Sequence, residues 1–365
     1  MGPTAESIAH FIHGVVTAYF FTWTIFIWNL RKQSNMMYML FLCMAYIAFC
    51  LVKDMVFLVD GLSEDFFWSG LSLTVDIIAV PLAMNFFVEV VSPGLVTGRK
   101  LLVQVGAQSL FIPLFVIFPT QLMLDIALYS AYLGGICSLV IISVLLARHR
   151  KFIRDNYSYT EHVDVTWSIR CIIGLFVCIT AYVIISNYET WTSRTILHLL
   201  LMVAWLYLSR LARNHSVVEM PPLVMFAFPL VRKTEPEVED AAVSSEVYSG
   251  LAEQLNECMS KGKLYLNPKL TLQDVCTEIG TNRTYLSDYL NNVLNTTFYE
   301  YVNELRIRTA CEIIGSMTPE NKRSMLEISE VSGFNSISTF NRSFVKMMGV
   351  TPSQYMSKTS KTSSK

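Results

Sequence analysis

Two short runs near the C-terminus concentrate side chains that hydrogen-bond to the edges of DNA bases. Arg pairs with guanine, Asn pairs with adenine, and Ser or Thr contacts either. Ten residues in these runs are candidates for DNA contact: Asn282, Arg283, Thr284, Ser287, Ser336, Ile337, Ser338, Thr339, Asn341 and Arg342. Arg342 and Arg306 have an equal alternative, which is to touch only phosphates or to form ion pairs within the domain.

The first run follows a pattern that predicts two helices joined by a tight turn. Thr271, with Asp274 three positions later, is a good helix N-cap, and Gly280 supplies a turn with positive φ. The second helix is expected over residues 283–293. The expected inward residues of the two helices are Leu272, Val275, Cys276, Ile279, Leu286, Leu290 and Val293. Such a unit projects its second helix from a compact core.

The same arrangement recurs in residues 325–344, with Gly333 at the turn and Ser336 as the cap of the second helix. Its expected core residues are Ile328, Val331, Phe334, Phe340 and Phe344. Between the units we expect a helix over 298–314, with Tyr301, Leu305, Ile313 and Ile314 inward and Arg306 and Arg308 outward. This rigid link should separate the two projecting helices by about 34 Å, one turn of B-DNA.

The charge of this region is only slightly positive. From Val247 to the C-terminus there are thirteen Lys and Arg residues against eleven acidic ones. Nucleic-acid binding usually requires a larger excess of positive charge. We therefore expect binding to double-stranded DNA to depend on where the cations lie and on a homodimer or a membrane partner.

Residues 264–356 resemble the DNA-binding domain of the AraC/XylS family of bacterial transcription regulators. The stretches that carry the resemblance run from Leu270 to Ser287, Phe298 to Ile307, Ser332 to Phe344 and Gly349 to Tyr355. The resemblance implies two helices in the major groove, binding near a promoter, and contact with RNA polymerase.

The first two thirds of the chain are too apolar for a water-soluble protein. Hydrophobic residues make up 53% of the sequence and the mean hydropathy is +0.42. Stretches of about 20 residues, separated by short charged runs, are long enough to cross a bilayer. We predict seven membrane spans, at 8–30, 36–52, 66–91, 101–119, 122–147, 169–186 and 195–212.

The cations between these spans are placed unevenly. Eleven flank one side of the predicted bundle: Arg31, Lys32, Arg99, Lys100, Arg148, Arg150, Lys151, Arg154, Arg170, Arg210 and Arg213. The other side has only Lys53 and Arg194. Because Lys and Arg stay on the cytoplasmic side, we predict a multi-pass protein of the bacterial inner membrane. Its N-terminus would lie outside and its C-terminal domain in the cytoplasm.

Polar side chains within the predicted spans are candidates for sensing a signal, since such groups are costly in lipid. Asp76, Asn85 and His198 are the candidates, and Pro81 predicts a kink between the first two. A polar pocket formed by Asp76 and His198 is one hypothesis. The alternative is that each makes an interhelical hydrogen bond that only fixes packing.

The sequence thus predicts an all-α protein with a seven-helix transmembrane domain at 1–213, a connector at 214–245, a domain with two helix-turn-helix units at 246–357 and a disordered tail at 358–365. It has no nucleophile motif, metal-ligand spacing or phosphate loop, so we expect no enzyme activity, cofactor or metal. Three hypotheses are open: an intact sensor of a small molecule or membrane protein, a tethered factor released by proteolysis, and a transporter-like bundle with a regulatory domain.

Overall fold

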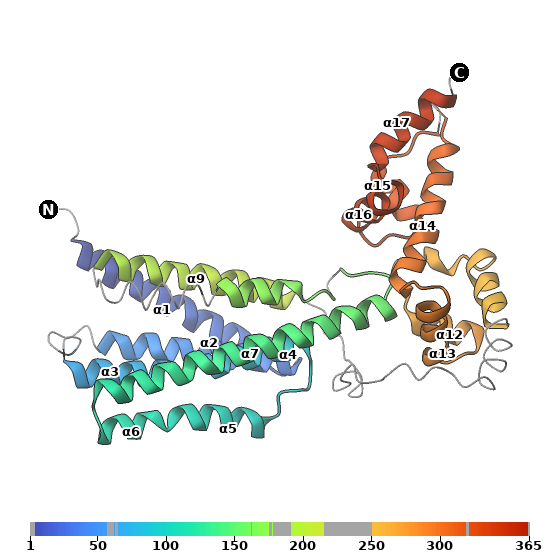
Figure 1. Cartoon of the computed structure of the whole chain (residues 1–365). Helices are drawn as coiled ribbons and strands as arrows, with labels where there is room; N and C mark the ends of the chain where they lie inside the picture. Colours follow the sequence, from blue (N-terminus) through green and yellow to red (C-terminus); the bar gives the residue numbers. More distant parts are fainter. Residues whose placement is uncertain are drawn as a thin grey trace, which may run out of the picture. The chain divides into compact units, whose positions relative to one another are not determined.

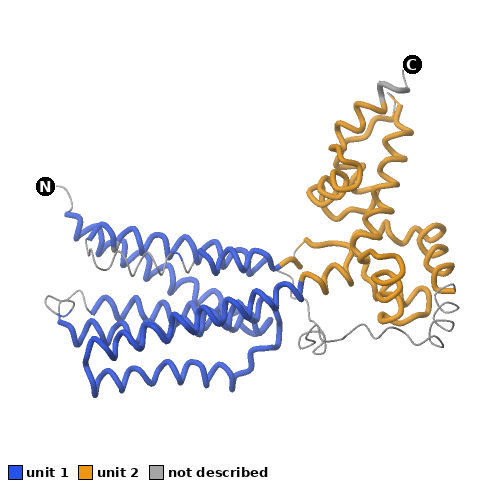
Figure 2. Tube along the Cα trace, in the orientation of Figure 1, with its two compact units in different colours: residues 1–149, 165–225 blue, residues 150–164, 226–365 orange. Residues whose placement is uncertain are grey.

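The computed structural model describes residues 4–56, 62, 65–161, 163–174, 177, 191–214, 250–318 and 321–363. These residues form helices, with one isolated antiparallel bridge between Tyr157 and Thr271, which confirms the all-α prediction. The chain divides into two compact units (Figure 2). Unit 1 contains residues 1–149 and 165–225, and unit 2 contains residues 150–164 and 226–365.

Unit 1 consists of long apolar helices (Figure 1). They are α1 (Ala5–Leu30), α2 (Asn35–Val56), α3 (Phe66–Asp76), α4 (Ala79–Val91), α5 (Gly98–Ser109), α6 (Phe111–Ile117), α7 (Gln121–Asn156) and α9 (Trp191–Arg213). With α3 and α4 joined, and α5 and α6 joined, six stretches of the described chain are long and apolar enough to cross a membrane. The predicted span at 169–186 lies mostly outside the described residues, so the number seven stays a prediction.

Two of these stretches are interrupted close to a proline. The break between α3 and α4 falls at Ile77 and Ile78, four and three residues before Pro81, as the predicted kink requires. The break between α5 and α6 falls at Leu110, just before Pro113. Proline has no amide hydrogen to donate to the carbonyl four residues earlier, so the regular helix cannot continue there.

The core of unit 1 lies where α1 packs against α2 and α9, and α2 against α4. Its fully buried side chains include Phe20, Leu40, Met44, Phe86 and Phe87. The outward faces are also apolar, as shown by Leu102, Tyr129 and Leu133, each more than 60% exposed. Large exposed apolar faces are unfavourable in water and suit contact with lipid.

Unit 2 contains a helix at 250–260, a short 3₁₀ helix η1 (Leu264–Leu266), and two pairs of helices joined by α14 (Phe298–Gly315). Each pair lies where a helix-turn-helix unit is predicted, and we keep that name for it. The first helix-turn-helix unit comprises α12 (Leu272–Ile279), α13 (Arg283–Asp288) and the π-helical η2 (Tyr289–Val293). The second comprises α15 (Met325–Val331) and α16 (Ile337–Met348), and α17 (Pro352–Ser363) follows. Each helix-turn-helix unit has its own core. Helix α14 supplies Phe298 and Val302 to the core of the first and Ile307, Ala310 and Ile314 to the core of the second.

Local capping explains where these helices begin. Thr271 with Asp274, Thr297 with Glu300, and Ser324 with Glu327 form capping boxes, in which the two side chains satisfy backbone N–H groups reciprocally. Gly280 and Gly333 end the first helix of each unit with φ of 70° and 84°. The predicted caps and glycine turns are therefore confirmed.

Several expectations for unit 2 are wrong. Arg306, expected to point outward, is 1% exposed. Val293 and Val331, expected in the cores, are 47% and 49% exposed. The segment expected to be a disordered tail is partly covered by α17. The helix predicted over 283–293 is present over those bounds, with an α-helical part to Asp288 and a π-helical part from Tyr289 to Val293.

The division into units also differs from the predicted one. Residues 150–164, which we placed in the membrane domain, pack with the helix-turn-helix domain (Figure 2). This segment includes the end of α7, which extends nine residues beyond the predicted span that ends at 147. We refer to residues 150–164 as the inserted segment.

Candidate nucleic-acid interface

Helix α16 presents most of its predicted contact residues to solvent. Ser336 caps the helix by accepting a hydrogen bond from the Thr339 amide at 3.2 Å. Phe340 and Phe344 point into the core, and this fixes which face of the helix is exposed. The outward residues are Ile337, Ser338, Asn341, Arg342 and Val345. The exposed face therefore carries an amide and a guanidinium, the two groups best suited to base recognition.

The other two candidates in this run are not free. Thr339 is 2% exposed, and its hydroxyl donates to a carboxylate oxygen of Glu161. The Ser336 hydroxyl donates to the same oxygen at 2.6 Å. Asn335 donates its side-chain amide to the other oxygen at 3.4 Å. The start of α16 thus holds an anion that the inserted segment supplies.

In the first helix-turn-helix unit, the candidate contact residues lie at the start of α13. Asn282 is its N-cap and accepts from the Tyr285 amide at 2.9 Å. Thr284 is exposed, whereas Ser287 is half-buried and accepts from the Asn291 side chain at 3.1 Å. The structure thus supports a capping role for Asn282 and leaves Thr284 as an open contact residue.

Arg283 is held by the inserted segment. Its guanidinium donates to the side-chain oxygen of Asn156 and lies 5.7 Å from the centre of the Phe152 ring. A guanidinium over an aromatic face gains a cation–π attraction in addition to the hydrogen bond. Both predicted contact runs are therefore engaged, at their first turns, by residues that lie more than 100 positions away in sequence.

Arg306 fixes the inserted segment to the domain. It donates to the carbonyl oxygen of Ser158 at 3.1 Å and to its hydroxyl oxygen at 3.0 Å. It also donates to the carbonyl oxygens of Tyr265 and Asn267, each at 2.7 Å. Burial lowers the pKa of Arg306 to about 10, so the side chain stays charged at neutral pH. A buried charge must be hydrogen-bonded in this way, and Ser158 is one of its principal acceptors.

A second ionic cluster lies at the start of α14. Glu300 accepts from Arg154 at 2.6 Å and from Lys346 of α16 at 2.7 Å. Burial by itself would raise the pKa of Glu300, but the hydrogen bonds and charges of these partners lower it to about 2. Glu300 thus joins the inserted segment, the linking helix and the second helix-turn-helix unit.

The sequence analysis missed the roles of Asn156, Ser158, Glu161 and Arg306. For Arg306 a signal was present, because it lies four residues after buried Val302 and four before buried Ala310. For the three residues of the inserted segment, no local pattern predicts a partner so distant in sequence. Burial alone would raise the pKa of Glu161, but the hydrogen bonds from Ser336 and Thr339 hold it below its ordinary value.

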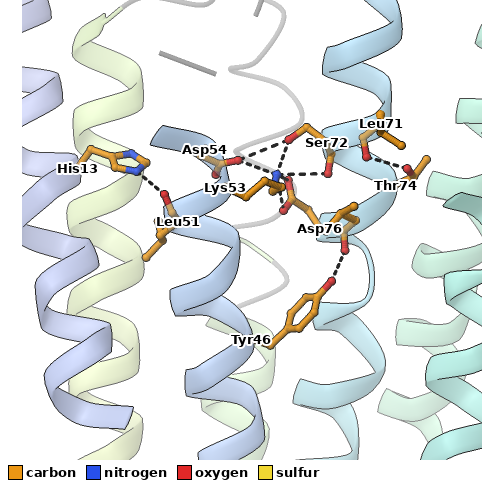
Figure 3. Close-up of polar contacts among 10 residues, drawn as sticks. His13, Tyr46, Leu51, Lys53, Asp54, Leu71, Ser72, Thr74 and Asp76 are labelled. Atoms are coloured by element: carbon orange, nitrogen blue, oxygen red, sulfur yellow. Dashed lines mark hydrogen bonds and ion pairs between the residues drawn. The ribbon is translucent and has the colours of Figure 1, made fainter. Parts of the chain in front are cut away.

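In unit 1, Asp76 is part of an ion-pair cluster (Figure 3). The Lys53 ammonium lies 3.0 Å from Asp76 and 2.7 Å from Asp54, and it also donates to Ser72. The Tyr46 hydroxyl donates to the Val75 carbonyl beside Asp76 at 2.6 Å. The cluster joins the end of α2 to the end of α3, immediately before the break at Ile77.

The other two candidates for sensing lie elsewhere in unit 1. Asn85 donates to the Pro81 carbonyl at 2.7 Å and to Gln104 of α5. The ring of His198 packs against that of His13, with centroids 4.6 Å apart, and His13 bonds to the Leu51 carbonyl at 2.8 Å. Asp76 and His198 therefore belong to separate clusters. Within the residues that the structure describes, no group of three or more His, Cys, Asp and Glu side chains is placed to hold a metal ion.

Residues 275–358 match the family model of a helix-turn-helix domain. The melibiose operon regulatory proteins of Escherichia coli strain K12 and of E. coli O6:H1 strain CFT073 are each 29% identical to the chain over 86 residues. This match covers 24% of the chain, and the chain spans only 27% of the length of these curated relatives.

Among solved structures, the C-terminal domain of the two-component response regulator yesN from Fusobacterium nucleatum is 19% identical. It is covered over 98% of its length and covers 32% of this chain, with a TM-score of 0.23. The sequence matches agree with the AraC/XylS resemblance for the C-terminal domain, which is a helix-turn-helix domain.

Proposed function

We propose that this chain is a membrane-embedded, one-component transcription regulator that binds promoter DNA through its two helix-turn-helix units. The observation that carries the proposal is the outward face of α16, where Asn341 and Arg342 stand exposed on a helix whose opposite face is fixed in a core. The family match over 275–358 supports the same reading. The similarity to a melibiose operon regulator supports a role at promoters.

The packing of the inserted segment supports the proposed membrane topology. This segment follows the fifth predicted span, yet it forms one compact unit with residues after the last span. Both parts must lie on the same side of a membrane, so the chain has to cross an even number of times between them. The predicted spans at 169–186 and 195–212 satisfy this condition, and the cation asymmetry assigns that side to the cytoplasm.

Unit 1 would then be the sensory part. The cluster of Lys53, Asp54 and Asp76 brings three charged side chains together in an otherwise apolar unit, and it lies directly before a break in a helix. We propose that a small molecule or a membrane protein acts on this unit and so alters DNA binding.

The test is genome-wide mapping of DNA cross-linked to the full-length chain in its native host. The double substitution Asn341→Ala and Arg342→Ala should remove the enriched sites, because each bidentate base contact contributes about 1–3 kcal/mol. Arg308→Ala is the matched control, since it removes an exposed charge from α14 without touching α16. Enrichment that survives the double substitution would refute the assignment of α16, provided that the variant reaches the membrane as the wild type does.

A further inference from the structure

The inserted segment reaches the start of the exposed helix in both helix-turn-helix units. Asn156 accepts from Arg283 at the beginning of α13, and Glu161 accepts from Ser336 and Thr339 at the beginning of α16. A segment of fifteen residues thus engages both surfaces that are candidates for DNA contact.

Glu161 uses donors that would suit a DNA phosphate. Helix N-termini and hydroxyl side chains are common donors to the phosphate backbone. At α16 the hydroxyls of Ser336 and Thr339 and the amide of Asn335 all point at the Glu161 carboxylate. A carboxylate and a phosphate cannot occupy the same donors together, and the negative charge of Glu161 also repels DNA.

Ser158 and Glu161 are held to the domain to different degrees. Ser158 is fully buried, accepts two hydrogen bonds from buried Arg306, and donates its hydroxyl to the Leu270 carbonyl at 2.7 Å. Glu161 lies three residues further on, is only half-buried, and is held by side-chain hydrogen bonds alone at the start of α16. Glu161 can therefore leave α16 while Ser158 stays anchored.

We propose that Glu161 is an internal competitor of DNA, which occupies the first turn of α16 until the inserted segment shifts. The inference rests on the proposed function, because it needs α16 to contact DNA. Glu161 lies four residues before Val165, where the chain enters unit 1, so a displacement of unit 1 reaches Glu161 along the chain without passing through Ser158.

The experiment measures binding of the full-length chain, in lipid nanodiscs, to a pool of random-sequence 40-base-pair duplexes at several salt concentrations. Such a pool reports contacts to phosphate, so no target site has to be known. Glu161→Gln and Glu161→Ala should both bind at least about threefold more tightly than wild type at low salt. The logarithm of their binding constant should also fall more steeply with the logarithm of the salt concentration, by the amount expected for about one additional phosphate contact. Glu312→Gln is the matched control, since it removes the same charge from an exposed position on α14.

The possible outcomes distinguish a failure of the Glu161 inference from a failure of the proposed function. The role of Glu161 as a competitor of DNA is supported if both Glu161 variants bind more tightly and with a steeper salt dependence than wild type, while Glu312→Gln does not. If wild type binds the duplexes and the Glu161 variants bind equally or more weakly, Glu161 is only a structural cap and the inference fails. If no variant binds duplex DNA, the proposed function fails together with it. Amide exchange across α16 verifies that the variants remain folded.

Discussion

The two helix-turn-helix units share one local design and differ in what surrounds their turns. In each, a capping box starts the first helix, a left-handed glycine ends it, and a polar N-cap starts the second. A Cβ at Gly280 would meet nothing within 4 Å, whereas at Gly333 it would lie 2.7 Å from the Leu266 backbone. The second turn is thus packed against η1, and the first turn is open.

The exposed helices differ as well. Helix α13 passes into a π-helix after six residues, and its Arg283 is already bonded. Helix α16 is regular over twelve residues and leaves Asn341 and Arg342 exposed, with Arg342 donating to the Thr339 hydroxyl of the same helix at 3.3 Å. Local sequence therefore builds the motif twice, and tertiary surroundings decide how rigid and how accessible each copy is.

The largest expected difference concerns the two glycines. Gly333→Ala should lower the free energy of unfolding of the second helix-turn-helix unit by about 3 kcal/mol, because the alanine would have a strained φ and its Cβ would clash with the backbone of Leu266. Gly280→Ala should cost only about 1 kcal/mol, from the strained φ alone. Amide hydrogen exchange within α12 and α15 measures both values. Equal losses would show that the packing at Gly333 does not distinguish the turns.

A smaller difference is expected in DNA affinity. Arg342→Ala should weaken binding to a duplex selected from a random library by about 2 kcal/mol, as expected for the loss of a base contact. Arg283→Ala should cost less than about 1 kcal/mol, since its half-buried guanidinium is bonded to Asn156 and lies over the Phe152 ring, whereas that of Arg342 is exposed. Fluorescence anisotropy with the full-length chain gives both values. A larger loss of affinity for Arg283→Ala than for Arg342→Ala would mean that α13 contributes more than α16 to DNA recognition.

The smallest effect concerns Glu300, which links the two helix-turn-helix units. Its pKa is lowered to about 2, so the ionised form stabilises the fold fully above the ordinary pKa near 4.5. That contribution is lost as the pH falls from 4.5 towards 2, and we expect about 1 kcal/mol after screening by solvent. Glu300→Gln should lack this part of the pH dependence in thermal unfolding followed by circular dichroism. An identical acid response in both proteins would contradict the role of the cluster.

Sequence reasoning succeeded where structure is determined by neighbours along the chain. Thr271, Gly280, Gly333 and Ser336 have their predicted roles because capping and positive φ depend on a few adjacent residues. Six of the predicted membrane-length stretches were found for the same reason, since hydropathy is a local property.

It failed where a partner lies far away in sequence. Arg306 was expected outward because it is charged, yet it is buried beneath Ser158, 148 positions earlier. Glu161 and Thr339 are separated by 178 positions, and a charged loop between two apolar helices gives no sign of such a partner. Val293 and Val331 were expected inward from their apolar character and helical spacing, which do not determine burial at the end of a helix.

The position of the inserted segment has a consequence for how the protein is made. Ser158 leaves the ribosome well before Arg306, and the last described long apolar helix, α9, is synthesised between them. Under the proposed membrane topology, the helix-turn-helix domain therefore lacks one of the acceptors of its buried guanidinium until both parts of the chain meet on the same side. We expect a chain that inserts wrongly to produce a domain in which Arg306 keeps its bonds to Tyr265 and Asn267 but loses those to Ser158, so that correct membrane insertion increases the stability of the DNA-binding domain.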